Sequence, residues 1–168
     1  VKQKRTDGDT ETAMKLAEKA LAIRPKYEEV QTTLLRLQAQ HEDWSGARAT
    51  LAAALKAGNL PRDVHKRRDG VLALAHARDA MAEGKIAEAT RDAEAAQRMA
   101  PGLVPAAVMS ARLAIAGDKP KVATKILKSA WDTDPHPDIA AARPELADTD
   151  PAATPHARLP ALRHAPRP

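Results

Sequence analysis

A 34-residue spacing runs through most of this chain and restricts the folds it can adopt. Segments 8–25 (GDTETAMKLAEKALAIRP) and 84–101 (GKIAEATRDAEAAQRMAP) have equal length, and each opens on glycine and closes on proline. Two more divergent copies occupy 42–59 and 118–135. Successive members of each aligned column are 34, 42 and 34 residues apart, which indicates a 34-residue repeat with one eight-residue insertion. The columns are Ala13, Ala47, Ala89 and Ala123; Ala20, Ala54, Ala96 and Ala130; and Pro25, Asn59, Pro101 and Pro135.

Within each copy the pattern predicts one amphipathic helix. Ala13, Ala17 and Ala20 recur at helical spacing, so they form a single stripe. Small side chains let two helix axes approach closely, and leucine on this stripe would overpack the contact at a cost of about 1–3 kcal/mol. The opening glycine is expected to end the preceding helix in a left-handed turn, and the closing proline to stop its own helix.

The composition supports an all-α fold. Only 2% of the residues are aromatic and none is Phe, whereas strong helix formers dominate. There is no cysteine, which excludes disulfides and thiolate chemistry, and no apolar run has the length of a membrane span. The net charge of +5 suits anionic partners, but single-stranded nucleic acid needs aromatic stacking platforms, so no nucleic-acid partner is predicted.

Between the copies lie segments suited to partner helices, at about 27–41, within 62–81, and at 103–116. The whole pattern resembles the tetratricopeptide repeat (TPR), in which 34 residues form a pair of antiparallel helices. We therefore predict a right-handed TPR-like α-solenoid of about three and a half repeats over residues 1–137. Its parts are a half repeat at 8–27, repeats at 28–61, 70–103 and 104–137, and the insertion at 62–69; residues 138–168 form a short helix and a proline-rich tail.

Two features of this array are open at the sequence level. The half repeat leaves an apolar face bare, so we expect further repeats upstream, in a longer protein of which Val1 is not the start. The insertion RDVHKRRD either lengthens the first helix of the next repeat by two turns, or Asp69 caps a fresh helix. Its basic patch (Lys66, Arg67 and Arg68) is either a solvated helix start or a contact for lipid phosphates or an acidic partner.

The TPR resemblance implies a concave groove lined by the first helix of each pair. The ninth repeat position, which faces that groove in the family, is Arg36, Arg78 and Arg112, and the fifth is Thr32, Leu74 and Val108. The arginines predict a ladder for carboxylates or peptide carbonyls of a bound protein segment, unless each simply pairs with a local acid. The fifth-position residues do not match the Lys/Asn clamp of chaperone-binding members. Exposed array ends and the proline-rich tail also suggest self-association.

No catalytic or metal-binding pattern is visible. The six histidines make no i, i+4 pair, and there is no HExxH, phosphate loop or Ser/His/Asp pattern. We therefore predict no enzymatic activity, no cofactor and no metal site. His76 is expected to pack between helices.

Residues 100–140 carry a second resemblance. They read APGLVPAAVMSARLAIAGDKPKVATKILKSAWDTDPHPDIA, and with LPRDVHKRRDGVLALA at 60–75 they are similar to the C-terminal repeats of HemY-type bacterial proteins. This resemblance implies a TPR protein linked to late haem biosynthesis, held by an upstream anchor at the cytoplasmic face of the inner membrane.

Three functions remain open. The first is a non-catalytic adaptor that gathers haem-pathway or envelope proteins through the arginine groove. The second is a regulator of cell-envelope assembly with the same fold. The third is a tetrapyrrole carrier using His76 or His136, which no haem-attachment motif supports.

Overall fold

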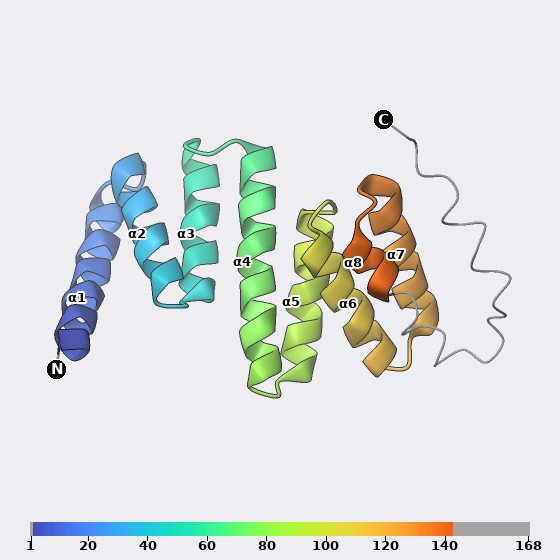
Figure 1. The fold of residues 1–168 in the computed structure, drawn as a ribbon. Helices are drawn as coiled ribbons and strands as arrows, with labels where there is room; N and C mark the ends of the chain where they lie inside the picture. Colours follow the sequence, from blue (N-terminus) through green and yellow to red (C-terminus); the bar gives the residue numbers. More distant parts are fainter. Residues whose placement is uncertain (1, 143–168) are drawn as a thin grey trace, which may run out of the picture.

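A computed structural model describes residues 2–142 of the chain, with side chains from Asp9 onward. This region is entirely helical and contains no strand, so the predicted all-α class is confirmed (Figure 1). The helices are α1 (Lys2–Ile23), α2 (Glu28–Gln40), α3 (Trp44–Ala57), α4 (Arg62–Ala82), α5 (Ile86–Met99), α6 (Val104–Ala116), α7 (Pro120–Thr133) and α8 (Pro137–Ala142).

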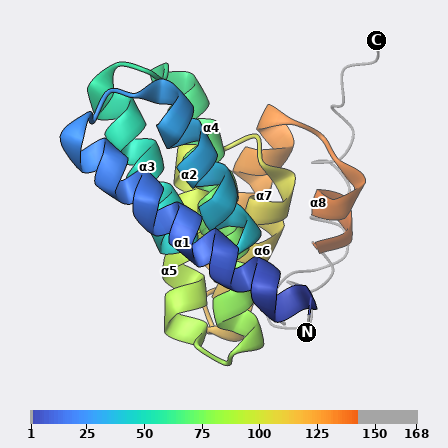
Figure 2. The same cartoon turned by 90° about the vertical axis from the view of Figure 1, so that its left-hand side faces the viewer.

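Helices α1 to α7 stand in a row, and each packs mainly on its neighbours in sequence (Figure 1). They pair as α2/α3, α4/α5 and α6/α7, while α1 precedes the first pair and α8 packs on α6. Seen from the α1 end, the later helices stack behind α1 (Figure 2). The arrangement is the α-solenoid that the 34-residue spacing predicts. No helix among the described residues is both long and apolar enough to cross a membrane.

The repeat sets where the helices end. The helix of each copy (α1, α3, α5 and α7) ends two residues before the closing column, at Ile23, Ala57, Met99 and Thr133. Ala100 and Asp134, the residues before two of the prolines, have non-helical backbones, with ψ of 78° and 98°, because proline disfavours the helical conformation in the residue before it. The closing prolines therefore lie where the sequence predicts a helix stop.

A left-handed residue ends the first helix of each described pair. Glu42, Gly84 and Asp118 have φ of 59°, 75° and 54°, and they occupy the opening position of their copies. In each case the following residue donates its backbone N–H to a carbonyl five residues earlier, as in a Schellman motif. Gly8, the fourth member of this column, does not follow the prediction, because α1 continues through it as helix. The 8–25 copy is therefore part of a longer, 22-residue helix.

The alanine columns form helix contacts, but one part of the prediction is wrong. Ala47, Ala89, Ala96, Ala123 and Ala130 are buried, while the remaining three, Ala13, Ala20 and Ala54, are half-buried. Leucine is nevertheless tolerated midway along the stripe. Leu51 and Leu127 stand in the column of Ala17 and Ala93 and are each about 1% exposed.

Among the three helix pairs, only α4/α5 has small residues along its whole contact. On the α4 side, Gly70, Ala73, Ala77 and Ala80 face α5. The facing residues are Ala89, Ala93 and Ala96 of α5 and Ala100 just after it, and all eight residues are buried. A Cβ on Gly70 would lie 2.9 Å from the Cβ of Ala100 and 3.2 Å from the carbonyl oxygen of Ala96. The two helices approach too closely for any larger side chain at this point.

The insertion lengthens α4, as the first of the two alternatives proposed. The helix runs unbroken over 21 residues, with Gly70 in its middle. Asp69 is not a helix cap, because it lies inside this helix and is 5% exposed.

Asn59 and Gln31 form a hydrogen-bonded bridge between two turns. Asn59, which stands where the other three copies close on proline, donates to Oε1 of Gln31 at 2.8 Å and to the carbonyl of Lys26 at 3.0 Å. Gln31 in turn donates to the carbonyl of Pro25 at 2.6 Å. This polar bridge joins the turn after α1 to the turn after α3. The proline-rich tail, at residues 143–168, lies outside the described residues.

Candidate functional site

Two depressions lie on one face of the array. They are lined by the first helix of each pair (α2, α4 and α6) and by the short helix α8. The predicted arginine ladder is divided between them. Arg78 and Arg112 line a depression of about 570 Å³ formed by α4, α6 and α8. Arg36 lines a separate depression of about 620 Å³ between α2 and the lengthened half of α4.

The α4/α6/α8 depression combines an apolar floor with charged walls. Met81, Val108, Met109 and Leu113 supply apolar surface. Asp138, at the start of α8, adds a carboxylate to the lining of the same depression. The site is thus suited to a segment with apolar anchors and polar or acidic flanks.

The α2/α4 depression gathers most of the basic patch. Arg67 and Arg68 line it together with Arg36, and Asp63 is its one acidic lining residue. Leu35, Val64, Leu72 and the half-exposed Val71 provide apolar surface beside these charges. Lys66 is exposed and does not line it. The eight-residue insertion therefore builds one wall of this depression, a relation that the sequence did not reveal.

The fifth-position residues do not form one row of groove contacts, and this part of the prediction is wrong. Leu74 is only 5% exposed and belongs to a core cluster with Ala73, Ala96 and Ala106. Val108 is 8% exposed, although it contributes to the floor of the α4/α6/α8 depression. Thr32 alone is exposed, in the α2/α4 depression.

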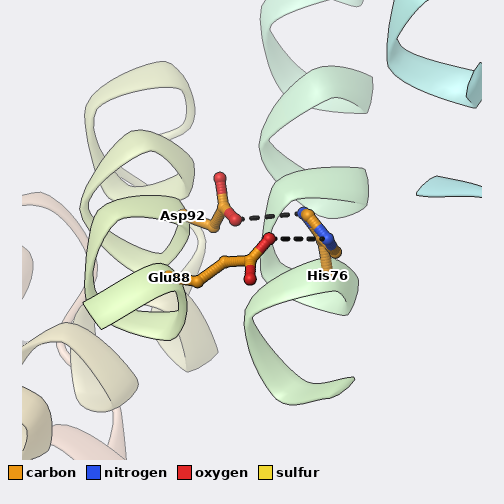
Figure 3. A group of neighbouring side chains, drawn as sticks. All are labelled: His76, Glu88 and Asp92. Atoms are coloured by element: carbon orange, nitrogen blue, oxygen red, sulfur yellow. Dashed lines mark ion pairs between the residues drawn. The ribbon is translucent and has the colours of Figure 1, made fainter. Parts of the chain in front are cut away.

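A charged cluster joins α4 to α5, and its residues line neither depression (Figure 3). Nδ1 of His76 lies 3.0 Å from Oδ2 of Asp92, and Nε2 of the same ring lies 3.5 Å from Oε1 of Glu88. Glu88 and Asp92 are four residues apart on α5, so both carboxylates face the His76 ring. The side chains of His76 and Glu88 are about one third exposed, whereas that of Asp92 is 7% exposed.

Arg48 of α3 extends the cluster across a third helix. Its Nε donates to Oδ1 of Asp69 at 2.7 Å, and its Nη1 lies 3.5 Å from Oδ1 of Asp92. The hydrogen bond to Asp69, reinforced by the charges of Asp69 and Asp92, raises the pKa of the Arg48 guanidinium above its ordinary value although burial opposes this. Arg48 therefore remains charged and holds two buried carboxylates.

This cluster was not predicted from the sequence, because its one histidine has no histidine four residues away. One signal in the sequence could have indicated the cluster. Glu88 and Asp92 are four residues apart in the 84–101 copy, and the helix paired with this copy carries His76. His136 has a local role instead: its Nδ1 accepts the backbone N–H of Asp138 at 3.2 Å, at the start of α8.

Comparison with known proteins supports the repeat. A tetratricopeptide repeat family model matches residues 5–66, which include most of α1, all of α2 and α3, and the start of α4. Among solved structures, a thermophilic TPR protein from Thermus thermophilus is similar at a TM-score of 0.40 and 22% identity, covering 88% of this chain and 77% of that one. No curated protein matches the chain.

Proposed function

We propose that this protein is a non-catalytic scaffold that binds a segment of a partner protein along the face of α2, α4, α6 and α8. The observation that carries the proposal is the pair of depressions on one face, each with apolar surface next to arginine side chains. TPR-type arrays act by such protein contacts, and the repeat match at 5–66 supports this general role.

The lining residues define the chemistry of the partner segment. Arginine recognises carboxylates through a planar array of donors, so acidic side chains or a C-terminal carboxylate suit both depressions. Apolar side chains of the same segment would pack on Met81 and Met109 in one depression and on Leu35 and Val71 in the other. The preferred ligand is an acidic segment with interspersed apolar anchors.

We further propose that the partners are haem-pathway or other envelope proteins at the cytoplasmic face of the inner membrane. The support is the similarity of residues 100–140 and 60–75 to HemY-type repeats. Regulation of envelope assembly by the same face is the alternative. No feature of the described residues favours the tetrapyrrole carrier.

Charge reversal tests the face. Arg36, Arg78 and Arg112 are changed together to Glu, and capture of partners from membrane and soluble extracts is compared by quantitative mass spectrometry. The matched control reverses Arg91 and Arg98, exposed residues of α5 that line neither depression. We expect the triple variant to lose specific partners while its helical circular dichroism is unchanged. Equal capture by the triple variant and the wild type would exclude this face.

The identity of the captured proteins tests the finer proposal separately. Enrichment of haem-pathway enzymes from membranes supports the HemY-type role, whereas enrichment of envelope-assembly proteins alone supports the alternative.

A further inference from the structure

We infer that His76, Glu88 and Asp92 form a binding site for a divalent transition-metal ion, with Zn²⁺ as the best-suited ion. Imidazole nitrogen together with carboxylate oxygen is a ligand set that Zn²⁺ accepts. One ligand atom from each residue can be chosen so that all three lie within 4.8 Å of one another. Three ligands from α4 and α5 would leave the fourth position of a tetrahedral site for water.

The distances require only a small adjustment. Tetrahedral Zn²⁺ with its usual bond lengths separates ligand atoms by roughly 3.3 Å. The separations between His76 and the two carboxylates are 3.0 and 3.5 Å, although they involve opposite nitrogens of the ring. Each ring nitrogen faces a different carboxylate, so an ion bound to one nitrogen requires the more distant carboxylate to move toward it. Glu88, whose side chain is 34% exposed, has the freedom to do so.

An unsatisfied buried atom points to a ligand at this place. Oδ2 of Asp92 is buried and accepts no aligned hydrogen bond, even though Nδ1 of His76 lies 3.0 Å away. A buried carboxylate oxygen without a donor is costly, and native proteins rarely retain one. A metal ion would coordinate this oxygen directly. Arg48 holds the opposite oxygen of Asp92 and keeps the carboxylate oriented toward His76.

The charge balance agrees with a divalent ion. The cluster contains three carboxylates, those of Asp69, Glu88 and Asp92, and Arg48 pairs with two of them, Asp69 and Asp92. With a neutral His76, these three carboxylates and Arg48 carry a net charge of −2, which a divalent ion would neutralise. Arg91 approaches Glu88 only from the solvent side, at 3.8 Å. The ion would also join the two helices of the middle pair and so stabilise the centre of the array.

Isothermal titration of the chelator-treated 168-residue chain with Zn²⁺ tests the site. We expect one saturable site whose Kd rises at least about ten-fold in His76→Gln and in Glu88→Gln. The controls are His41→Gln, an exposed histidine after α2, and Glu94→Gln, an exposed glutamate of α5. Neither should change the Kd. Glu88 is partly exposed, so its variant remains informative if another variant folds poorly.

Two further readouts separate the metal from its alternatives. Zn²⁺ at a hundred-fold excess over its Kd should raise the Tm by roughly 5–10 °C in the wild type and not in His76→Gln. The ¹⁵N shifts of the His76 ring should change on addition of Zn²⁺. An unchanged Kd in His76→Gln would overturn the inference. It would equally be overturned by a His76 ring that is doubly protonated at neutral pH and indifferent to Zn²⁺, because a proton would then supply the compensating charge.

Discussion

Replacing Gly70 by alanine should destabilise the protein, against the usual effect of this change in a helix. Alanine in a helix interior is normally better than glycine by about 1 kcal/mol. Here the new Cβ would lie 2.9 Å from the Cβ of Ala100 and 3.2 Å from the backbone oxygen of Ala96. Overpacking of this kind costs about 1–3 kcal/mol, and the backbone contact cannot move out of the way as a side chain would. We therefore expect a net loss of about 1 kcal/mol.

Urea unfolding followed by tryptophan fluorescence measures this change. Trp44 donates to Asp79 and thereby joins α3 to α4, so its emission reports on the packing of α4. A loss of about 1 kcal/mol corresponds to a fall in Tm of roughly 2–4 °C for a chain of this size. Gly102→Ala is the matched control, because no atom lies within 4 Å of its new Cβ; it should leave stability unchanged or slightly raised.

A double mutant separates the clash from other causes. Ala100→Gly removes the nearest atom, so Gly70→Ala should cost less in the Ala100→Gly background than in the wild type. The contact with the Ala96 oxygen remains, and the recovery should be partial. A Gly70→Ala protein about 1 kcal/mol more stable than the wild type would refute the close approach of α4 and α5.

Three other substitutions test the remaining contacts by the same unfolding measurement. Arg48→Met should lower stability by about 3 kcal/mol, because it leaves Asp69 and Asp92 buried without their partner; an effect below about 1 kcal/mol would contradict the buried network. Asp118→Gly should raise stability by about 0.5–1 kcal/mol, since φ is 54° at this position; a loss would show that the aspartate side chain matters more than the backbone. Asn59→Pro should lower stability by about 2 kcal/mol, although proline closes the other copies. The change removes one backbone and two side-chain hydrogen bonds of Asn59, so a gain in stability would refute the bridge to the turn after α1.

The repeat made the architecture predictable, because the residues that end its helices act through local backbone preferences. Closing residues such as Pro101 stop helices through their own backbone chemistry, and the left-handed position at Gly84 needs no tertiary information. Gly8 shows the limit of this reasoning. Glycine permits a left-handed turn without requiring one, and here the chain continues as helix.

The site was less predictable, because it depends on distances between helices. The sequence placed Arg36, Arg78 and Arg112 in one column, but the lengthened α4 divides the row into two depressions. Leu74 occupies a groove position by repeat number and yet is buried. The cluster of His76 with Asp92 required knowing which face of α5 meets α4, and pattern alone did not give that orientation.

The central claim, that the face of the first helices binds partners, is tested most directly by site-specific photo-crosslinking in cells that produce the protein. A photoreactive residue at Met81, in the α4/α6/α8 depression, is compared with one at Ile86, which is equally exposed (48% and 49%) but lines neither depression. We expect discrete partner adducts from position 81, absent from position 86 and lost when Arg78 and Arg112 are changed to Glu. Adducts of equal yield from both positions, or from position 86 alone, would contradict the account.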